Sequence, residues 1–273
     1  MRLKNKVIII TGSTTGIGKA IAQRCVTEGA KVIVHGREKK AGENVIKEIG
    51  EENGILHLDD LTDPLSAERL VNAAINSYGT LDAIVNNAAW VPASDIHNTD
   101  LKLLEDVFSV NTFAPYLLIK SALPHLTESK GSVLNIGSVN AWSGEPNLLA
   151  YSMSKGAMMT MTRNLGDALF REAGVRVNQI NPGWVLTEKE IERKRSQNLP
   201  YDWYTYLPKE FAPSGRIIWS KEIAAAVIYW LSEESGPITG QTVELEQYPL
   251  LGRNAPKDEV TIPARGNDES PKT

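Results

Sequence analysis

The chain has 273 residues, of which 42% are hydrophobic and 23% charged, and its formal net charge at pH 7 is −4. This globular composition excludes collagen-like, low-complexity and wholly disordered proteins, and without an excess of Lys and Arg we expect neither nucleic acid nor a membrane as a partner. The single cysteine, Cys25, excludes an internal disulfide, and the scattered histidines offer no zinc-binding spacing, so no metal site is expected.

The first predicted element is a strand at residues 7–10, a β-branched run that glycines follow directly. A continuous apolar run of this kind is typical of a strand buried on both faces of a parallel sheet. The run is too short for a signal peptide or a membrane span, so we expect a cytoplasmic protein. Helical spacing of Ile17, Ala20, Ile21 and Cys25 then predicts an amphipathic helix.

The same alternation continues along most of the chain. Further strands are predicted at 31–34, 55–58, 83–85, 132–136, 176–180 and 241–245, and further helices at 41–49, 65–78, 101–123, 150–172 and 223–231. Strands that alternate with helices of this length indicate an α/β fold, a doubly wound parallel sheet of the Rossmann type. We assign residues 1–251 to this one domain.

Two segments depart from the alternation. Residues 188–214 have no clean period but carry Tyr201, Trp203, Tyr204, Tyr206 and Phe211, and we expect an inserted substrate lid there. Flat rings with hydroxyl tips suit a sugar, a polyol or another ring substrate, and packing of the lid onto the body is an equal alternative. Residues 252–273, rich in Pro and charge, are expected to form an extended C-terminal tail.

Three glycines lie between the first strand and the first helix. Gly12, Gly16 and Gly18 would let backbone N–H groups approach the pyrophosphate of a dinucleotide, and the dipole of the helix would add to the attraction. A turn that uses glycine for steric reasons alone is the alternative. The strand before the turn and the helix after it favour dinucleotide binding.

The end of the second strand bears on the choice of cofactor. An acidic residue there would bind the ribose 2′-hydroxyl of NAD, whereas an Arg suits the 2′-phosphate of NADP. The sequence reads His35-Gly36-Arg37, with no carboxylate before Glu38. Arg37 could equally be a solvated surface residue, but the missing carboxylate favours NADP over NAD.

A Tyr and a Lys stand four residues apart, at Tyr151 and Lys155, on one face of a predicted helix. A free Tyr has a pKa of about 10, so acid–base chemistry by Tyr at neutral pH needs a neighbouring cation that stabilises its phenolate form. Ser138 follows the strand at 132–136, at the sheet edge where α/β proteins bind ligands.

Together these residues resemble the short-chain dehydrogenase/reductase family, in its single-domain form, from Lys6 to about Glu246. The matching motifs are Thr11-Gly12-x-x-x-Gly16-x-Gly18, Asp60-Leu61, Asn86-Asn87-Ala88, Asn111, Ser138, Tyr151-x-x-x-Lys155, Asn181-Pro182-Gly183, Thr187 and Thr239-Gly240. The resemblance implies that Tyr151 is the general acid or base, that Ser138 binds the carbonyl oxygen and that Lys155 lowers the Tyr151 pKa and holds the nicotinamide ribose.

The resemblance also implies the remaining contacts. Asp60 and Leu61 would flank the adenine, Asn87 and Ala88 the adenosine ribose, and the segment from Pro182 to Thr187 the nicotinamide. The residues expected to bind the cofactor are Gly12, Ser13, Thr14, Thr15, Gly16, Ile17, Gly18, His35, Gly36, Arg37, Asp60, Leu61, Asn87, Ala88, Ala89, Tyr151, Lys155, Pro182, Gly183, Val185 and Thr187.

Asn111 completes the implied catalytic set by supporting a water chain to Lys155. Pro115, four residues later, has no N–H to donate to the Asn111 carbonyl, which predicts a kink in the helix at 101–123. That carbonyl would then be free for an ordered water. The alternative is that Pro115 merely starts a new helical segment.

Two departures from the family pattern stand out. Ala89 replaces a usual glycine, so its backbone should avoid positive φ. The last strand ends Glu244-Leu245-Glu246-Gln247-Tyr248, where relatives often carry Asp-Gly-Gly, which puts in doubt the transfer of subunit contacts. Trp142 and Trp184 lie close behind Ser138 and Gly183, and either line the substrate pocket or simply pack.

The sequence therefore predicts an NADP-dependent oxidoreductase that interconverts a secondary alcohol and a ketone on a small molecule. The resemblance implies a homotetramer or homodimer, with the helices at 101–123 and 150–172 at the subunit contacts. A non-catalytic NADP-sensing regulatory protein is the alternative, although such proteins typically lack the Tyr or the Lys. A nucleotide-sugar epimerase or dehydratase would need a larger C-terminal domain.

Overall fold

The computed structural model describes residues 1–200, 202–205, 207–209 and 211–249. Its centre is a seven-stranded sheet in the order β3-β2-β1-β4-β5-β6-β9, with every neighbouring pair parallel. The strands are β1 (Val7–Ile10), β2 (Lys31–Gly36), β3 (Gly54–Leu58), β4 (Ala83–Asn86), β5 (Ser132–Ile136), β6 (Arg176–Pro182) and β9 (Thr242–Leu245). The chain order reverses at β1, so the predicted doubly wound topology is confirmed.

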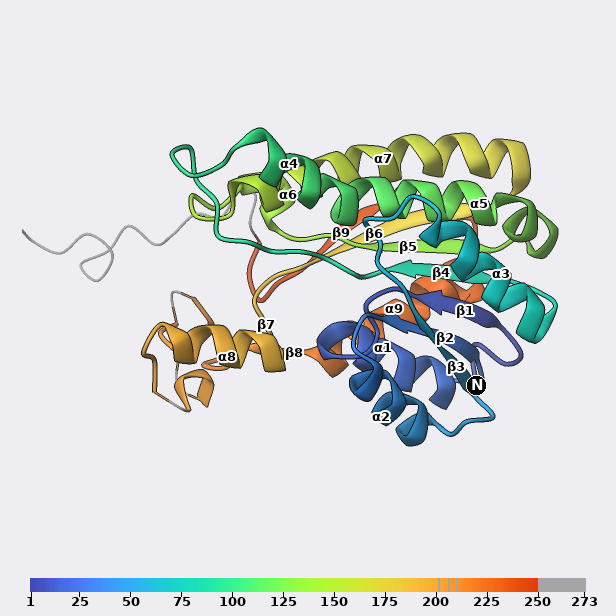
Figure 1. The fold of residues 1–273 in the computed structure, drawn as a ribbon, viewed down its shortest axis with the longest axis horizontal. Coiled ribbons are helices and arrows are strands. Elements are labelled where there is room, and N and C mark those ends of the chain that lie inside the picture. Colours follow the sequence, from blue (N-terminus) through green and yellow to red (C-terminus); the bar gives the residue numbers. More distant parts are fainter. Residues whose placement is uncertain (201, 206, 210, 250–273) are drawn as a thin grey trace, which may run out of the picture.

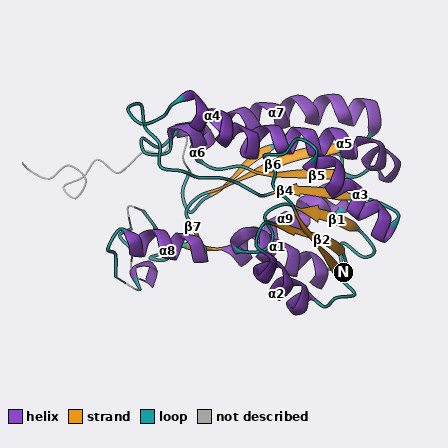
Figure 2. Cartoon of the chain, in the orientation of Figure 1, coloured by secondary structure: helices purple, strands orange, loops and turns teal. Residues whose placement is uncertain are grey.

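Helices cover both faces of this sheet (Figure 1). One face carries α1 (Gly16–Thr27), α2 (Lys39–Ile49) and α9 (Ser220–Leu231), and the other carries α3 (Ser66–Tyr78), α5 (Ala114–Ser129) and α7 (Leu149–Ala173). Figure 2 shows the resulting three layers, with strands between two sets of helices. Two shorter helices, α4 (Leu101–Phe108) and α6 (Asn140–Ser143), lie near the start of α7.

The apolar core follows from the period of the strands. Side chains alternate across a strand, so Ile8 and Ile10 pack beneath α1 and α9 while Val7 and Ile9 pack against the opposite layer. Because helices cover both faces, every residue of β1 is buried. This explains the uninterrupted apolar run that the sequence predicts as a strand.

The predicted helix at 101–123 is divided in the structure. A π-helical turn at Ser109–Phe113 separates α4 from α5, and the N–H of Ala114 donates to the carbonyl of Ser109, five residues back. Pro115 follows at the start of α5 and, lacking an N–H, cannot continue the regular helical pattern. The chain is therefore helical without a break from Leu101 to Ser129, and a wider π-turn that carries Asn111 stands at the position of the predicted kink.

The insertion after β6 also differs from the expectation of an irregular segment, because it begins with α8 (Glu188–Ser196). This helix lacks an apolar stripe. The sequence features that favour it are its N-terminal cap and the order of its charged residues. The Thr187 side chain accepts a hydrogen bond from the Glu190 N–H, acidic residues fill the first turn, and basic residues fill the last.

A two-stranded parallel pair closes the base of the insertion. The chain leaves the body through β7 (Val185–Leu186) and returns through β8 (Ile218–Trp219), with Val185 paired to Ile218. Between them lies a small apolar cluster of its own, formed by Trp203, Leu207, Ala212 and Ile217. The predicted contributions of Tyr201 and Tyr206 and the tail at 252–273 lie outside the described residues.

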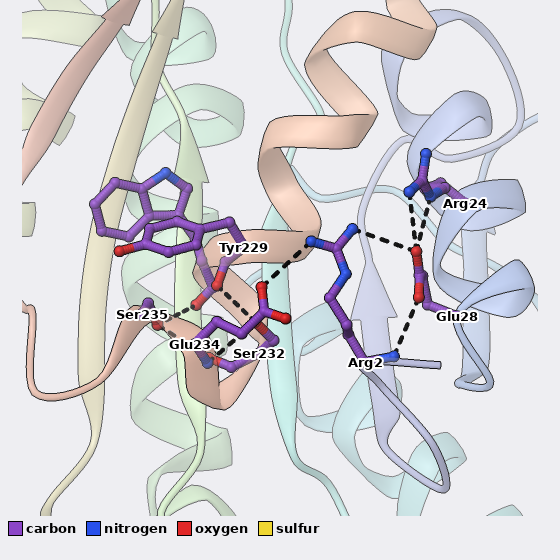
Figure 3. A network of polar contacts seen from close by, with 8 residues as sticks. Arg2, Arg24, Glu28, Tyr229, Ser232, Glu234 and Ser235 are labelled. Carbon is purple, nitrogen blue, oxygen red and sulfur yellow. Dashed lines mark hydrogen bonds and ion pairs between the residues drawn. The ribbon is translucent and has the colours of Figure 1, made fainter.

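An ion-pair network joins the N-terminal segment to the end of α1 and to the 3-10 turn at Glu233–Ser235 that follows α9. The backbone N–H and the guanidinium of Arg2 contact Glu28, at 3.1 and 3.3 Å, and the guanidinium also reaches Glu234 at 3.4 Å (Figure 3). Arg24, one turn before Glu28, adds a contact at 2.9 Å. Hydrogen bonds from the Arg2 backbone and from Arg24 lower the pKa of Glu28 to about 2.

This network predicts a pH-dependent contribution to stability. A carboxylate whose pKa is depressed on folding stabilises the protein above its unfolded pKa, and the contribution disappears as the pH falls towards the folded value. We expect Glu28→Gln to lower the melting temperature by about 2–4 °C at pH 7, and the difference to shrink as the pH is lowered from about 4.5 towards 2. Thermal unfolding followed by circular dichroism measures both.

The matched control is Glu234→Gln. That carboxylate is 54% exposed and forms one ion pair in the network, so its replacement should change the melting temperature less. A Glu28→Gln difference that stays constant between pH 7 and pH 3 would contradict the role of the Glu28 charge.

Candidate functional site

The predicted catalytic side chains converge at the carboxyl end of the sheet. Ser138 follows β5, and Tyr151 and Lys155 lie in the first turns of α7. The Lys155 amine is 5.7 Å from the centre of the Tyr151 ring. Ser138 and Tyr151 are joined by a hydrogen bond that favours the phenolate. The three residues that the sequence singles out are thus neighbours in space.

Ser138 is fixed by its surroundings. Its N–H donates to the Asn181 side chain at 3.2 Å, and its hydroxyl oxygen accepts the Asn140 N–H at 3.1 Å. Asn181 belongs to β6, so two adjacent strands set the position of the hydroxyl. Burial raises the pKa of Tyr151, and the hydrogen bond with Ser138 acts in the opposite direction. A lowering of the Tyr151 pKa by Lys155 stays a prediction.

Lys155 is the most unusual group in the core. Its side chain is 1% exposed, and its amine donates to the carbonyl of Ile136, the last residue of β5, at 2.7 Å. Removal from water disfavours the ammonium form and lowers the pKa of Lys155 to about 7. The amine can therefore exchange a proton near neutral pH.

Asn111 lies in the π-turn and is fully buried. Its side-chain amide donates to the Trp90 carbonyl at 2.9 Å and to the Ser154 hydroxyl at 3.0 Å, and its oxygen accepts the Trp90 N–H at 2.8 Å. The side chain thus ties the loop after β4 to α7, one residue before Lys155. The expected water chain through the Asn111 carbonyl stays a prediction.

The glycine turn has the close approaches that its sequence implies. Gly12 adopts a φ of +62°, and a Cβ there would lie 2.9 Å from the Ala88 Cα. A Cβ on Gly18 would lie 2.3 Å from the Gly12 carbonyl and 2.4 Å from the Asn87 amide. Asn87 also donates to the carbonyls of Thr11 and Gly12, so it braces the turn from β4.

Other predicted residues of this turn face the protein. The Ser13 hydroxyl donates to the Ile10 carbonyl at 2.7 Å and accepts the His35 N–H at 3.0 Å. Thr15 precedes α1 in extended backbone, and Ile17 packs against the core beneath that helix. Ser13 and Ile17 therefore shape the turn from within the fold.

At the end of β2 the chain leaves Arg37 in solvent. Its side chain is 72% exposed and lies 3.6 Å from the carboxylate of Asp60. Gly36 makes room for Thr14, because a Cβ at Gly36 would lie 2.5 Å from the Thr14 methyl group. Leu61 is buried next to Asp60 and packs in the core. Thr14, Arg37 and Asp60 thus border one end of the site.

The loop after β6 carries the other predicted contacts and reveals a residue that the sequence reasoning missed. The Glu246 carboxylate accepts the Trp184 N–H at 3.1 Å. A Cβ on Gly183 would lie 1.6 Å from a Glu246 oxygen, so the Glu246 side chain could hold this position only with glycine there. Pro182 ends β6, Val185 begins β7 and Thr187 caps α8. Glu246, which belongs to the departure from the family pattern at 244–248, therefore supports the loop after β6.

A second missed residue is Glu188, at the start of α8. Its carboxylate accepts the Gly16 N–H at 3.1 Å, in the first turn of α1. An anion is thus already placed where the helix dipole and free N–H groups attract one. No periodic or glycine-based signal pointed to Glu188, because the contact spans 172 residues.

The remaining expectations have mixed outcomes. Ala89 has no positive φ, as predicted. The Trp142 indole donates to Glu244, and the Trp184 ring stacks on Trp203 with ring centres 5.1 Å apart, so both tryptophans have packing partners. Within the described ranges, no His, Cys, Asp and Glu cluster could hold a metal, and no helix could cross a membrane.

The buried Lys155 amine predicts a pH-dependent stability difference. Between about pH 7 and 10 the unfolded chain holds this proton and the folded protein does not, so the stability of the native protein rises with pH across that window. Below it, both states hold the proton and the full cost of burial is present. We expect Lys155→Met to gain melting temperature relative to the native protein at pH 6, and the difference to fall towards pH 10.

Thermal unfolding of the ligand-free protein at several pH values measures this difference. The loss of the hydrogen bond to the Ile136 carbonyl changes the melting temperature of the variant by an amount that does not depend on pH. The diagnostic quantity is therefore the slope of the difference in melting temperature against pH. Lys120→Met, at an exposed position of α5, is the control and should show no slope relative to the native protein. A flat difference for Lys155→Met would contradict the burial cost.

Comparisons with known proteins identify the family of this chain. The sequence profile of the short chain dehydrogenase family matches residues 6–198. Glucose 1-dehydrogenase 2 of Bacillus subtilis (strain 168) is 33% identical over 247 residues, which cover 88% of this chain and 93% of that protein. The NADP-dependent (R)-specific alcohol dehydrogenase of Lentilactobacillus kefiri is 31% identical over 244 residues, covering 88% and 94% of the two chains.

A solved structure is similar throughout. The crystal structure of 3-ketoacyl-(acyl-carrier-protein) reductase from Brucella melitensis, complexed with NADH, has a TM-score of 0.78 and 27% identity, and the match covers 89% of this chain and 97% of that one. With a family profile over most of the chain and relatives similar along nearly all of it, the chain belongs to the short-chain dehydrogenase/reductase family of NAD(P)-using oxidoreductases.

Proposed function

We propose that this enzyme interconverts a secondary alcohol and a ketone with NADP as the cofactor. The observation that carries the proposal is the meeting of Ser138, Tyr151 and Lys155 at the carboxyl edge of the sheet. The glycine turn opens onto the same edge, because β1 is parallel to β4 and β4 to β5. A proton-transferring group and a dinucleotide site therefore lie on one side of the molecule.

The site fits a dinucleotide on its own evidence. The first turn of α1 already accommodates the Glu188 carboxylate at the Gly16 N–H, and close packing at Gly12 and Gly18 leaves no space for side chains. Residues of the turn would hold the pyrophosphate, and the segment from Pro182 to Thr187 the nicotinamide. When bound, the cofactor supplies the hydride chemistry.

The protein's own groups would manage the proton. Ser138 would donate a hydrogen bond to the carbonyl oxygen of the substrate, and the Tyr151 hydroxyl would give that oxygen its proton. In the reverse direction the Tyr151 oxygen would accept the proton from the alcohol. Lys155 would return the proton from its amine, which can exchange near neutral pH because of burial.

Selection of NADP rests on the end of β2. Arg37 is exposed there, and no carboxylate precedes it in β2 to meet a ribose hydroxyl. A 2′-phosphate would compete with the Asp60 carboxylate for Arg37, and the Thr14 side chain lies beside the same strand end. The NADP dependence named for the Lentilactobacillus relative supports this choice, and the NADH in the Brucella structure makes NAD the alternative.

The proposal extends to the substrate class, the insertion, the assembly and the location. A ring substrate such as a sugar or polyol agrees with the name of the Bacillus relative.

The insertion at 188–214 would act as a lid, hinged on the β7–β8 pair. A homotetramer or homodimer would cover the exposed Leu101, Phe113 and Tyr116 on α4, the π-turn and α5, and a cytoplasmic location would suit such an enzyme.

The cofactor preference is tested by Arg37→Ala. A charged hydrogen bond to the 2′-phosphate is worth about 1.5–3 kcal/mol, so the native protein should bind NADPH at least about tenfold more tightly than NADH. The variant should lose most of that gap while its affinity for NADH stays the same. Fluorescence titration with both nucleotides gives the two dissociation constants. Equal affinities in the native protein would overturn the NADP assignment.

The contact between Glu188 and Gly16 leads to a second prediction. A pyrophosphate that binds at the first turn of α1 must displace this carboxylate, so Glu188→Ala should bind NADPH more tightly, by about threefold or more. Lys189→Ala, at the next residue, is the control and should leave the affinity unchanged. Weaker NADPH binding by Glu188→Ala would indicate that the carboxylate supports the bound state instead.

A further inference from the structure

His35 lies below the glycine turn, as the fifth residue of β2. It is 3% exposed, and its backbone makes two hydrogen bonds with Ser13. The His35 N–H donates to the Ser13 hydroxyl at 3.0 Å, and the His35 carbonyl accepts the Ser13 N–H at 2.8 Å. The turn between β1 and α1 is therefore attached to β2 at this residue.

The imidazole makes a further contact with the turn. The N–H of Gly12 donates to His35 Nδ1 at 3.1 Å. A backbone N–H can only donate, so Nδ1 carries a lone pair and the ring proton resides on Nε2. Burial lowers the pKa of His35 to about 4, which keeps the ring in this neutral form at neutral pH.

The other ring nitrogen argues against a role in packing alone. Nε2 is buried and makes no hydrogen bond of regular geometry in the described structure, which is unfavourable for a polar atom, and the backbone of Asp59 is the polar group that interacts with the ring and raises the pKa of His35. An apolar side chain of similar size would fill the same space without that cost. The feature that an apolar residue could not supply is the acceptor for Gly12.

Gly12 is constrained on its other sides as well. Its carbonyl accepts the Asn87 amide at 3.1 Å, and its Cα faces Ala88 so closely that no Cβ fits. With the Gly12 N–H on the His35 ring and the Ser13 N–H on the His35 carbonyl, both groups point into the protein. The N–H groups that remain for phosphate are those further along, towards Gly16.

We infer that His35 is a positioning residue for the dinucleotide, whose neutral ring accepts the Gly12 N–H and so fixes the glycine turn in the shape that receives the pyrophosphate. The ring does this from below the turn, without contacting the cofactor, which differs from the direct contact expected from the sequence. The inference rests on the proposed function to the extent that NADPH is the ligand measured.

Three substitutions separate the acceptor from the bulk of the ring. His35→Asn places an amide oxygen at the position of Nδ1, His35→Gln places its amide near the position of Nε2, and His35→Leu supplies volume without an acceptor. Melting temperatures and circular dichroism spectra establish that each variant is folded. NADPH affinity is measured by fluorescence titration. Steady-state kinetics with any carbonyl substrate that the native enzyme reduces give kcat and the KM for NADPH.

We expect His35→Leu and His35→Gln to bind NADPH about tenfold more weakly than the native protein, because the Gly12 N–H loses its partner. His35→Asn should stay within about threefold of the native affinity. The KM for NADPH should follow the same order, whereas kcat at saturating NADPH should change by less than about twofold. A residue that only stabilised the fold would not produce this rescue by Asn.

Equal NADPH affinity in the Leu variant and the native protein would overturn the inference, as would equal losses in all three variants. If the Leu variant does not fold, the comparison of Asn with Gln decides by the same criterion. A native protein that binds NADH but not NADPH would overturn the NADP proposal alone, and the same three variants would then be compared with NADH. A native protein that binds neither nucleotide would overturn both.

Discussion

The bond between the Lys155 amine and the carbonyl of Ile136 is the contact on which the site depends. It places an amine at the end of a buried central strand, where water does not compete for it. Parallel strands end at one edge, so whatever is fixed to the end of β5 is also fixed relative to the glycine turn after β1. The same burial that makes the amine unstable as a cation gives it a pKa of about 7. A cost to the fold and a property useful for proton transfer therefore have one physical origin.

Carboxylates of the protein itself occupy two positions that cofactor phosphates would take under the proposed function. Glu188 holds the Gly16 N–H, and Asp60 lies near Arg37. Both contacts are at the surface, where an ion pair or charged hydrogen bond contributes little and exchanges readily. A phosphate with several oxygens can replace each of them with stronger bonds. These carboxylates keep the cationic and N–H groups in place in the free protein without closing the site.

The sequence predicts the fold well where a local pattern is strong. The apolar run at Val7–Ile10 and the glycines behind it specify a buried strand and a tight turn, and both are present. The π-turn around Asn111 was not predictable from periodicity, because Pro115 indicates only that the regular pattern is interrupted. Helix α8 was missed for another reason, since its caps and charge order carry a signal that an apolar period does not.

Candidate site residues divide in the same way. Ser138, Tyr151 and Lys155 belong to a spacing that chemistry constrains, and the structure brings them together. Glu188 and Glu246 act through contacts with residues that are far away in the sequence. The departure from the family pattern at 244–248 includes Glu246 but does not indicate its role, and no local pattern marks Glu188. His35 was noticed for its position beside Arg37, but only the fold shows which ring atom is used and what it holds.

The contacts of Glu188 and Thr187 connect the insertion to the cofactor site. Thr187 caps α8 through the Glu190 N–H, and the next residue along the chain reaches the first turn of α1. The start of α8 is therefore shared between the insertion and the glycine turn, so an anion that takes the place of Glu188 removes one of the contacts that hold α8 near the body. After the loss of that contact α8 would still be held by the hydrogen bond from the Trp184 indole to Glu190, and β7 and β8 would still close the base of the insertion. Under the proposed function, anion binding at the turn and the position of α8 would therefore be coupled through Glu188, and each would affect the other to the same degree.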